Sequence, residues 1–357
     1  MDTMRHIYWF NPASDLSLAD GTDNYTPPRF AAELQHALQL LPCWLAPAGA
    51  MVLVTDDCDR SWPARHGIDV ELITPAQLPL LDNCVFHPWG WSHATRRDLL
   101  RMGATEQDLP DLALLDALRQ LAHRRTTIAV HRQLTSLLGT QLWPRPVECV
   151  TMQQVMRFVD DNPRCYVKAP WSGSGRGIYR VEHQPAREFV QWCGGVLRRQ
   201  GSVLCETALD RTMDCAVEFE CRDGECRVVG YSVFDVDAHN QYAGGLVDAT
   251  ATLHALIAAR YSALDEVVEA LRQTLTTLVA PHYAGPLGAD MILYRTSTGS
   301  TSINPCVELN LRHTMGMVAA ALGQRHAMRG RFVIAPPTTP HRLALTPTSA
   351  RQAALLV

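Results

Sequence analysis

Residues 168–177, Lys-Ala-Pro-Trp-Ser-Gly-Ser-Gly-Arg-Gly, are the most informative stretch of this 357-residue chain. They follow an apolar β-rich run, residues 165–169, and a second run, residues 177–181, comes after them. Lys168 is the only lysine among the 32 Lys and Arg residues. Glycines let backbone N–H groups approach a polyphosphate, and an ammonium on the adjoining strand can pair with the same phosphates. Since Arg replaces Lys poorly where a compact charge is needed, the stretch predicts a phosphate site.

The order of lysine and glycines excludes two familiar phosphate sites. In the P-loop the lysine follows the glycines and a helix begins there. In protein kinases the glycine-rich loop precedes the lysine. The alternative interpretation is an ordinary Gly/Ser hairpin beside a chance lysine.

A second group of polar residues is Glu308-x-Asn310-x-Arg312. Side chains two apart on a strand point the same way, so Glu308 and Asn310 present two oxygen ligands on one face, and Arg312 joins them if the extended chain continues. Asp290, on the neighbouring predicted strand, would add a second carboxylate. Such oxygen ligands suit a Mg²⁺ that bridges phosphates. The alternative is a strand end with solvated polar residues.

Between these two groups lies an apolar run, residues 203–208, followed by Asp214. A strand that ends in a turn can hold a purine through main-chain hydrogen bonds, and an acid a few residues on can bind ribose hydroxyls. A purely structural strand is the alternative.

The first third of the chain alternates strands with helices, which implies a small, mostly parallel sheet. We expect strands at residues 5–10, 51–55, 70–74 and 83–87. Further on, Thr151 is a plausible N-cap, and Asp223-Gly224 predicts a hairpin turn between residues 215–221 and 226–234. The Pro- and Thr-rich tail from residue 335 is expected to be loosely packed.

Composition excludes several classes of function. A net charge of −4 offers no general footprint for nucleic acid. The pairs Arg96-Arg97, Arg124-Arg125 and Arg198-Arg199 are interpreted as solvated helix faces. The uncharged stretch 34–55 contains prolines and a glycine, so we expect no membrane span. The 11 cysteines lack C-x-x-C spacing and the N-terminus lacks a signal-peptide core, which indicates reduced, buried thiols in a cytoplasmic protein.

The order of these motifs resembles that of the ATP-grasp superfamily. A strand with the lysine and a glycine loop come first, an apolar hinge with Glu206 follows, and late strands carry Asp290 and Glu308-x-Asn310-x-Arg312. Residues 131–146 look like that family's entry to its small subdomain, where Arg132 replaces a usual lysine. The resemblance implies an α/β (α+β) chain with a Rossmann-like N-terminal domain followed by a two-subdomain ATP-grasp fold. The expected bounds are 1–125 for the Rossmann-like domain, 126–200 for the small subdomain, 201–334 for the C-terminal subdomain and 335–357 for the tail.

The resemblance also implies roles for single residues. Lys168 and Arg132 would hold the α- and β-phosphates of ATP, and Lys168 and Arg312 would be catalytic. Glu206 and the Thr207–Ala208 backbone would hold adenine, and Asp214 the ribose. The loop over the phosphates would be Ser172, Gly173, Ser174, Gly175 and Gly177. The Mg²⁺ ligands would be Asp290, Glu308 and Asn310.

The implied activity is ATP- and Mg²⁺-dependent ligation of a small-molecule carboxylate to an amine, or less often a thiol, through an acyl phosphate. The alternatives are a small-molecule phosphotransferase and a non-catalytic nucleotide-binding module. Strand ends of the N-terminal sheet and a later loop offer the substrate candidates, which are Asn11, Asp15, Trp91 and Tyr242. We expect no nucleic acid or membrane partner, and the sequence is compatible with an oligomer.

Overall fold

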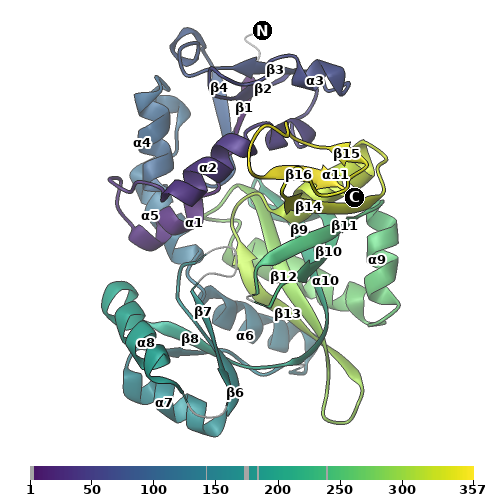
Figure 1. Ribbon diagram of the computed structural model, residues 1–357. Helices are drawn as coiled ribbons and strands as arrows, with labels where there is room; N and C mark the ends of the chain where they lie inside the picture. Colours follow the sequence, from purple (N-terminus) through teal and green to yellow (C-terminus); the bar gives the residue numbers. More distant parts are fainter. Residues whose placement is uncertain (1–3, 142, 173–176, 183–184, 239) are drawn as a thin grey trace. The chain divides into compact units, whose positions relative to one another are not determined.

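The computed structural model describes residues 4–141, 143–172, 177–182, 185–238 and 240–357 (Figure 1). The chain divides into two compact units, each built from separate segments. Unit 1 comprises Met1–Arg119, Ala243–Thr250 and Arg312–Val357, and unit 2 comprises Gln120–Tyr242 and Ala251–Leu311. This grouping places residues 312–357 in one unit with the N-terminal segment, whereas the expected bounds run consecutively along the chain.

A four-stranded parallel sheet forms the N-terminal part of unit 1, with the strand order β3-β2-β1-β4, and this confirms the predicted parallel sheet. Its strands are β1 (Arg5–Trp9), β2 (Ala50–Leu53), β3 (Val70–Ile73) and β4 (Cys84–Pro88). One face buries a cluster that includes Ile7, Phe86 and Leu99. The helices of this part are α1 (Ser14–Asp20), α2 (Arg29–Ala37), α3 (Trp62–Arg65), α4 (His93–Arg101) and α5 (Leu112–Leu121), with short 3-10 turns η1 (Leu41–Trp44), η2 (Leu78–Leu80) and η3 (Glu106–Asp108).

Strand β11 and the C-terminal residues of unit 1 form an antiparallel ladder with the order β11-β14-β16-β15. The strands are β11 (Tyr242–Val247), β14 (Gly330–Ala335), β15 (Leu343–Ala344) and β16 (Ala353–Leu356), and helix α11 (Met315–Arg325) precedes β14. The expectation of a loosely packed tail is wrong for β16. Both edges of β16 are paired and its four side chains are at most 5 % exposed, so apolar burial holds it in place.

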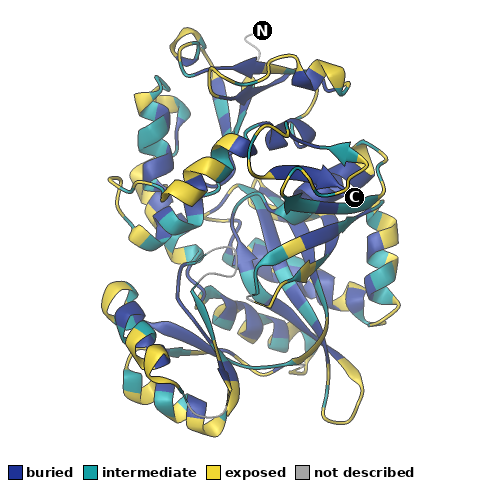
Figure 2. Cartoon of the chain, viewed as in Figure 1, coloured by how far each residue is buried: buried dark blue, intermediate teal, exposed yellow. Residues whose placement is uncertain are grey.

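The smaller sheet of unit 2 has the strand order β5-β8-β6-β7. Its strands are β5 (Val147–Cys149), β6 (Arg164–Lys168), β7 (Ile178–Glu182) and β8 (Val203–Thr207). Helices α7 (Met152–Asp161) and α8 (Arg187–Gln200) pack on it, each buried along one side and exposed along the other (Figure 2). Thr151 caps α7 through a reciprocal capping box with Gln154, which confirms the predicted N-cap.

The larger sheet of unit 2 is antiparallel, with the order β13-β12-β9-β10. Its strands are β9 (Asp210–Arg222), β10 (Glu225–Val236), β12 (Gly285–Arg295) and β13 (Thr301–Asn310). The turn between β9 and β10 is the predicted one, with φ of 55° at Asp223 and 76° at Gly224. The register places Cys221 opposite Cys226, and the two form a disulfide. The expectation that every cysteine is a reduced thiol is therefore wrong for this pair.

Helices α6 (Thr126–Leu138), α9 (Thr250–Ala258) and α10 (Leu264–Leu278) complete unit 2. A buried histidine joins α6 to the larger sheet, because a ring nitrogen of His131 lies 2.8 Å from the Cys306 carbonyl of β13. The ring of Trp143 meets the His131 ring edge-on. Over the residues that the structure describes, no helix is long and apolar enough to cross a membrane.

The burial of His131 predicts a pH-dependent stability. Burial lowers the pKa of His131 to about 4, from an ordinary value of about 6.5. The stabilising contribution of the neutral ring is complete above about pH 6.5 and is lost as pH falls toward 4, at a total of roughly 3 kcal/mol. His131→Gln keeps a donor for the Cys306 carbonyl. We expect its free energy of unfolding, measured in urea, to fall less than that of the wild type as the pH is lowered from 6.5 to 4. His36→Gln, at an exposed histidine, is the control and should leave it unchanged.

Candidate functional site

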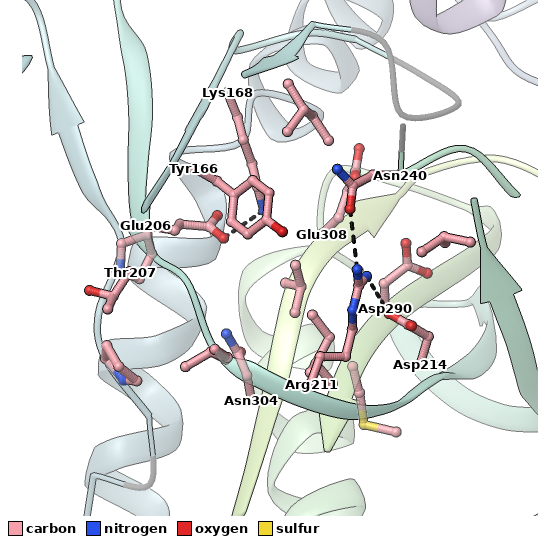
Figure 3. A pocket seen from close by; sticks show the side chains of 18 of the residues that line it. Tyr166, Lys168, Glu206, Thr207, Arg211, Asp214, Asn240, Asp290, Asn304 and Glu308 are labelled. Atoms are coloured by element: carbon pink, nitrogen blue, oxygen red, sulfur yellow. Dashed lines mark hydrogen bonds and ion pairs between the residues drawn. The ribbon is translucent and has the colours of Figure 1, made fainter. Parts of the chain in front are cut away.

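A cavity of about 130 Å³ lies in unit 2, and both of its sheets contribute to the wall (Figure 3). One part of the wall is apolar and includes Pro144, Pro146, Ile178, Leu209, Phe234, Val236, Met291, Ile292 and Val307. The other part is polar and consists of Tyr166, Lys168, Glu206, Thr207, Arg211, Asp214, Asn240, Asp290, Asn304 and Glu308. An apolar cleft with a few convergent charged groups is the usual form of a small-molecule site.

The single lysine lies at the end of β6 and enters this cavity. Lys168 is 5 % exposed, and its Nζ lies 2.5 Å from Oε2 of Glu206 at the end of β8. In the antiparallel register of β6 with β8, Lys168 pairs with Leu204 and Tyr166 pairs with Glu206, so the residues predicted for phosphate and for adenine are diagonal neighbours. This pairing supplies the counter-charge that a buried ammonium requires.

The chain segment that follows Glu206 is only partly available to a ligand. Thr207 and Leu209 line the cavity. The backbone N–H of Ala208 donates to the Arg164 carbonyl at 2.9 Å, which engages this amide within the sheet. Sequence reasoning proposed the Ala208 backbone for adenine, and in the structure that donor is already used.

The predicted ribose acid, Asp214, forms an ion pair with Arg211 that the sequence did not suggest. Arg211 Nη1 lies 3.1 Å from Oδ1 of Asp214, and Arg211 Nη2 donates to Asn240 Oδ1 at 3.3 Å. Figure 3 shows Arg211 rising between these two partners. Burial raises the pKa of the Asp214 carboxyl above its ordinary value, while Arg211 acts in the opposite direction. Nothing in the local sequence marks Arg211, because its role depends on the loop that carries Asn240.

The two predicted metal carboxylates face each other across the β12–β13 ladder. Asp290 pairs with Glu308, and both line the cavity. The ladder has a bulge between the pairs Asp290–Glu308 and Ile292–Asn304, because one residue of β12, Met291, lies opposite three residues of β13, 305–307. One of these three, Pro305, lacks the N–H that a regular ladder would use. Bulges next to active sites re-aim side chains, and here Asn304 also reaches the cavity wall.

Sequence reasoning missed Arg124, which is the best-anchored cation near these carboxylates. Its Nη2 lies 2.7 Å from Oε1 of Glu308, and its Nη1 donates to the Ala169 carbonyl at 2.7 Å. Nη1 also donates to Oγ of Ser172 at 2.5 Å. The interpretation of the Arg124-Arg125 pair as a solvated helix face is therefore wrong for Arg124, which is 4 % exposed.

Other predicted residues lie elsewhere or are not described. Arg132 is on the exposed side of α6 and does not belong to the cavity wall given above. Asn310 is buried two pairs beyond Glu308, opposite Gly288. Of the predicted phosphate loop, Gly173, Ser174 and Gly175 lie outside the described residues. Gly177 adopts a φ of 72°, where a Cβ would approach Ser172 to 2.8 Å, so glycine is required there.

The predicted catalytic arginine and one predicted substrate residue meet in unit 1. Arg312 Nε lies 2.8 Å from Oδ2 of Asp15, which is on α1. The side-chain amide of Asn11 is used in structural hydrogen bonds. It donates to the Gly90 carbonyl and to Thr95 Oγ1, the latter at 3.0 Å, and it accepts from the Gly90 N–H. The half-buried Trp91 packs against the core of unit 1.

Tyr242, the remaining substrate candidate, lies at the start of β11. Its ring centroid is 6.2 Å from that of Phe234, a residue of the cavity wall. Tyr242 therefore contacts a residue of the cavity wall and is not among the wall residues given above.

The residues fit a magnesium ion held jointly with phosphates. No group of three or more His, Cys, Asp and Glu side chains suited to a metal occurs in the described part of the chain. Mg²⁺ at nucleotide sites commonly takes only one or two protein carboxylates and completes its shell with phosphates and water. Asp290 and Glu308, directly opposite each other on the cavity wall, match that ligand set.

Comparison with known proteins gives a match in structure only. No protein-family model and no curated sequence matches the chain. The biotin carboxylase domain of 2-oxoglutarate carboxylase from Hydrogenobacter thermophilus, solved with MgADP, ADP and bicarbonate, superposes with a TM-score of 0.54 and 10 % identity over 100 % of this chain and 87 % of that one. Biotin carboxylase from Campylobacter jejuni gives a TM-score of 0.53 and 12 % identity over 94 % and 77 % of the two chains.

A third solved structure matches at similar length. N5-carboxyaminoimidazole synthetase from Staphylococcus aureus has a TM-score of 0.51 and 11 % identity over 100 % of this chain and 94 % of that one. These proteins are ATP-grasp enzymes. The chain has the ATP-grasp fold. The predicted fold class, α/β with a Rossmann-like part and a two-subdomain ATP-grasp part, is confirmed. Within unit 2, the small sheet and the large sheet both supply side chains to the cavity.

Proposed function

We propose that the chain is an ATP- and Mg²⁺-dependent ligase that joins a small-molecule carboxylate to an amine through an acyl phosphate. The observation that carries this proposal is the cavity itself. It gathers the only lysine, a pair of opposed carboxylates and an apolar wall, although these come from distant parts of the sequence. The MgADP and bicarbonate in the Hydrogenobacter thermophilus structure, which shares the fold, agree with this choice.

Each part of the wall suits one part of ATP. The apolar residues accept the base, and Asp214 accepts the ribose hydroxyls. Lys168 pairs with phosphate oxygens as a compact point charge. Asp290 and Glu308 hold Mg²⁺, which neutralises charge on the β- and γ-phosphates when bound. Phosphoryl transfer depends mainly on positioning and charge neutralisation, so no general acid or base is required of this wall.

The proposed reaction has two steps. An oxygen of the substrate carboxylate attacks the γ-phosphorus, the bond to the β–γ bridging oxygen breaks, and ADP leaves. The amine nitrogen then attacks the acyl carbon, inorganic phosphate leaves, and the nitrogen loses a proton.

Binding of Mg-ATP is the first test of this proposal. We expect titration calorimetry to give a dissociation constant in the micromolar to millimolar range, with weaker binding when Mg²⁺ is chelated. The reason is that the two carboxylates repel phosphates unless a cation lies between them. Absence of binding by every adenine nucleotide, with and without Mg²⁺, would contradict the proposal.

A substrate screen separates the ligase from its alternatives. Pairs of amino acids and dipeptides are incubated with Mg-ATP, and ADP release is measured. A ligase requires both a carboxylate and an amine for full turnover. ADP formation with a single acceptor and no amine indicates a phosphotransferase, and binding without turnover indicates a nucleotide-binding module.

A further inference from the structure

Arg124 connects two parts of the candidate site that belong to different sheets. Its Nη2 lies 2.7 Å from Glu308 Oε1 on β13. Its Nη1 reaches the segment that leaves β6 after Lys168, at the Ala169 carbonyl and at Ser172 Oγ. Because the guanidinium is planar and presents its donors in a rigid fork, these contacts fix both its position and its orientation.

The backbone of Arg124 is anchored as firmly as its side chain. Its N–H donates to the Pro170 carbonyl at 3.0 Å, and its carbonyl accepts from both the N–H and the Oγ1 of Thr127 at the start of α6. The side chain is 3 % exposed, against 23 % for Glu308. The guanidinium is therefore held in place without help from a ligand, and Glu308 lies at its more accessible end.

Charge explains why Glu308 needs such a partner. Asp290 lies directly opposite on β12, and like charges at that position of an antiparallel pair repel each other. The guanidinium offsets this repulsion and engages one oxygen of Glu308, Oε1. Oε2 is then the oxygen that remains for another cation.

We propose that Arg124 is a positioning residue that fixes Glu308 so that its second oxygen and the Asp290 carboxylate bind Mg²⁺ together. This role rests on the proposed function. Ligand carboxylates at metal sites are themselves hydrogen-bonded, and loss of such a partner typically costs about 10- to 100-fold in metal affinity or activity. Arg124 acts through Glu308 and is not itself a ligand.

The test measures how much Mg²⁺ strengthens ADP binding. Titration calorimetry of ADP with and without Mg²⁺ is carried out on the wild type, Arg124→Gln and Arg125→Gln. We expect Arg124→Gln to lose about tenfold or more of the Mg²⁺-dependent gain in affinity. Binding of ADP without Mg²⁺ should stay within about twofold. Arg125→Gln is the matched control, because Arg125 is the adjacent arginine but is 47 % exposed and donates to Gln120.

A double variant tests whether the effect passes through Glu308. If Arg124 acts through that carboxylate, Arg124→Gln combined with Glu308→Gln should bind Mg-ADP no more weakly than Glu308→Gln alone. A further loss of tenfold in the double variant would overturn the proposal. Should Arg124→Gln fail to fold, Arg124→Lys serves instead. It keeps the charge but lacks the planar fork whose two nitrogens contact Glu308 and Ser172, so the Mg²⁺ gain should still fall.

The remaining outcomes separate this inference from the proposed function. A wild type that binds no adenine nucleotide overturns both. A wild type that binds, with an unchanged Mg²⁺ gain in Arg124→Gln, overturns the role of Arg124 alone. A larger Mg²⁺ gain in Arg124→Gln also overturns it, because Arg124 would then be a competitor of the metal for Glu308.

Discussion

Lys168→Arg is expected to fold and to lose about two orders of magnitude or more of ATP-dependent turnover. The rest of the chain uses Arg at every other basic position, so the exchange is chemically acceptable in this protein in general. At Lys168 it is not, because the side chain is 5 % exposed and its Nζ already contacts Glu206 at 2.5 Å. A forked guanidinium needs more space, and overpacking of this kind costs about 1–3 kcal/mol. Turnover is measured by ADP release and folding by circular dichroism.

The matched control exchanges the same two residue types on the neighbouring strand. Arg180 of β7 is 51 % exposed and pairs with Glu182, so Arg180→Lys should retain full turnover. If Lys168→Arg is as active as Arg180→Lys, the single lysine is an accident of composition and carries no phosphate-binding role.

The local features of the fold were predictable because they depend on a few adjacent residues. Asp223-Gly224 specifies its hairpin through two positive φ angles, and Thr151 specifies the start of α7 through its capping box. The division into units was not predictable in this way. Residues 312–357 join the N-terminal segment through contacts that no local pattern encodes, such as the hydrogen bond of 2.7 Å that the Trp44 indole donates to the Leu345 carbonyl.

In the candidate site, too, residues marked by a local pattern were predicted and a residue that depends on distant contacts was not. Strand alternation predicted Glu308 and Asn310 on one face, with Asp290 added from the neighbouring strand, and the register of β12 and β13 places Asp290 opposite Glu308. Arg124 was not predicted, because an Arg-Arg pair after a helix resembles a solvated surface. Its burial depends on a carboxylate 184 residues away in the sequence. Contacts of that separation become visible only once the sheets are assembled.

Glu308→Gln is expected to reduce turnover by about two orders of magnitude or more, together with the Mg²⁺-dependent part of nucleotide affinity. The amide keeps an oxygen that accepts from Arg124 Nη2, so the contact at 2.7 Å can persist while the negative charge is lost. Glu308→Ala removes the partner altogether and leaves a guanidinium whose side chain is only 3 % exposed. Breaking a buried pair in this way costs about 3–5 kcal/mol, and the 23 % exposure of Glu308 places the expected loss at the lower end.

The contrast between these two variants and a third isolates the role of the charge. Glu269 pairs with Arg272 at the same distance of 2.7 Å but is 51 % exposed on α10, so Glu269→Gln should change neither turnover nor stability measurably. Glu308→Gln should unfold in urea close to the wild type, and Glu308→Ala clearly earlier. If Glu308→Gln keeps near-normal turnover and Mg²⁺ dependence, then Glu308 serves only to neutralise Arg124. In that case Asp290 and the nucleotide would have to hold the metal without Glu308.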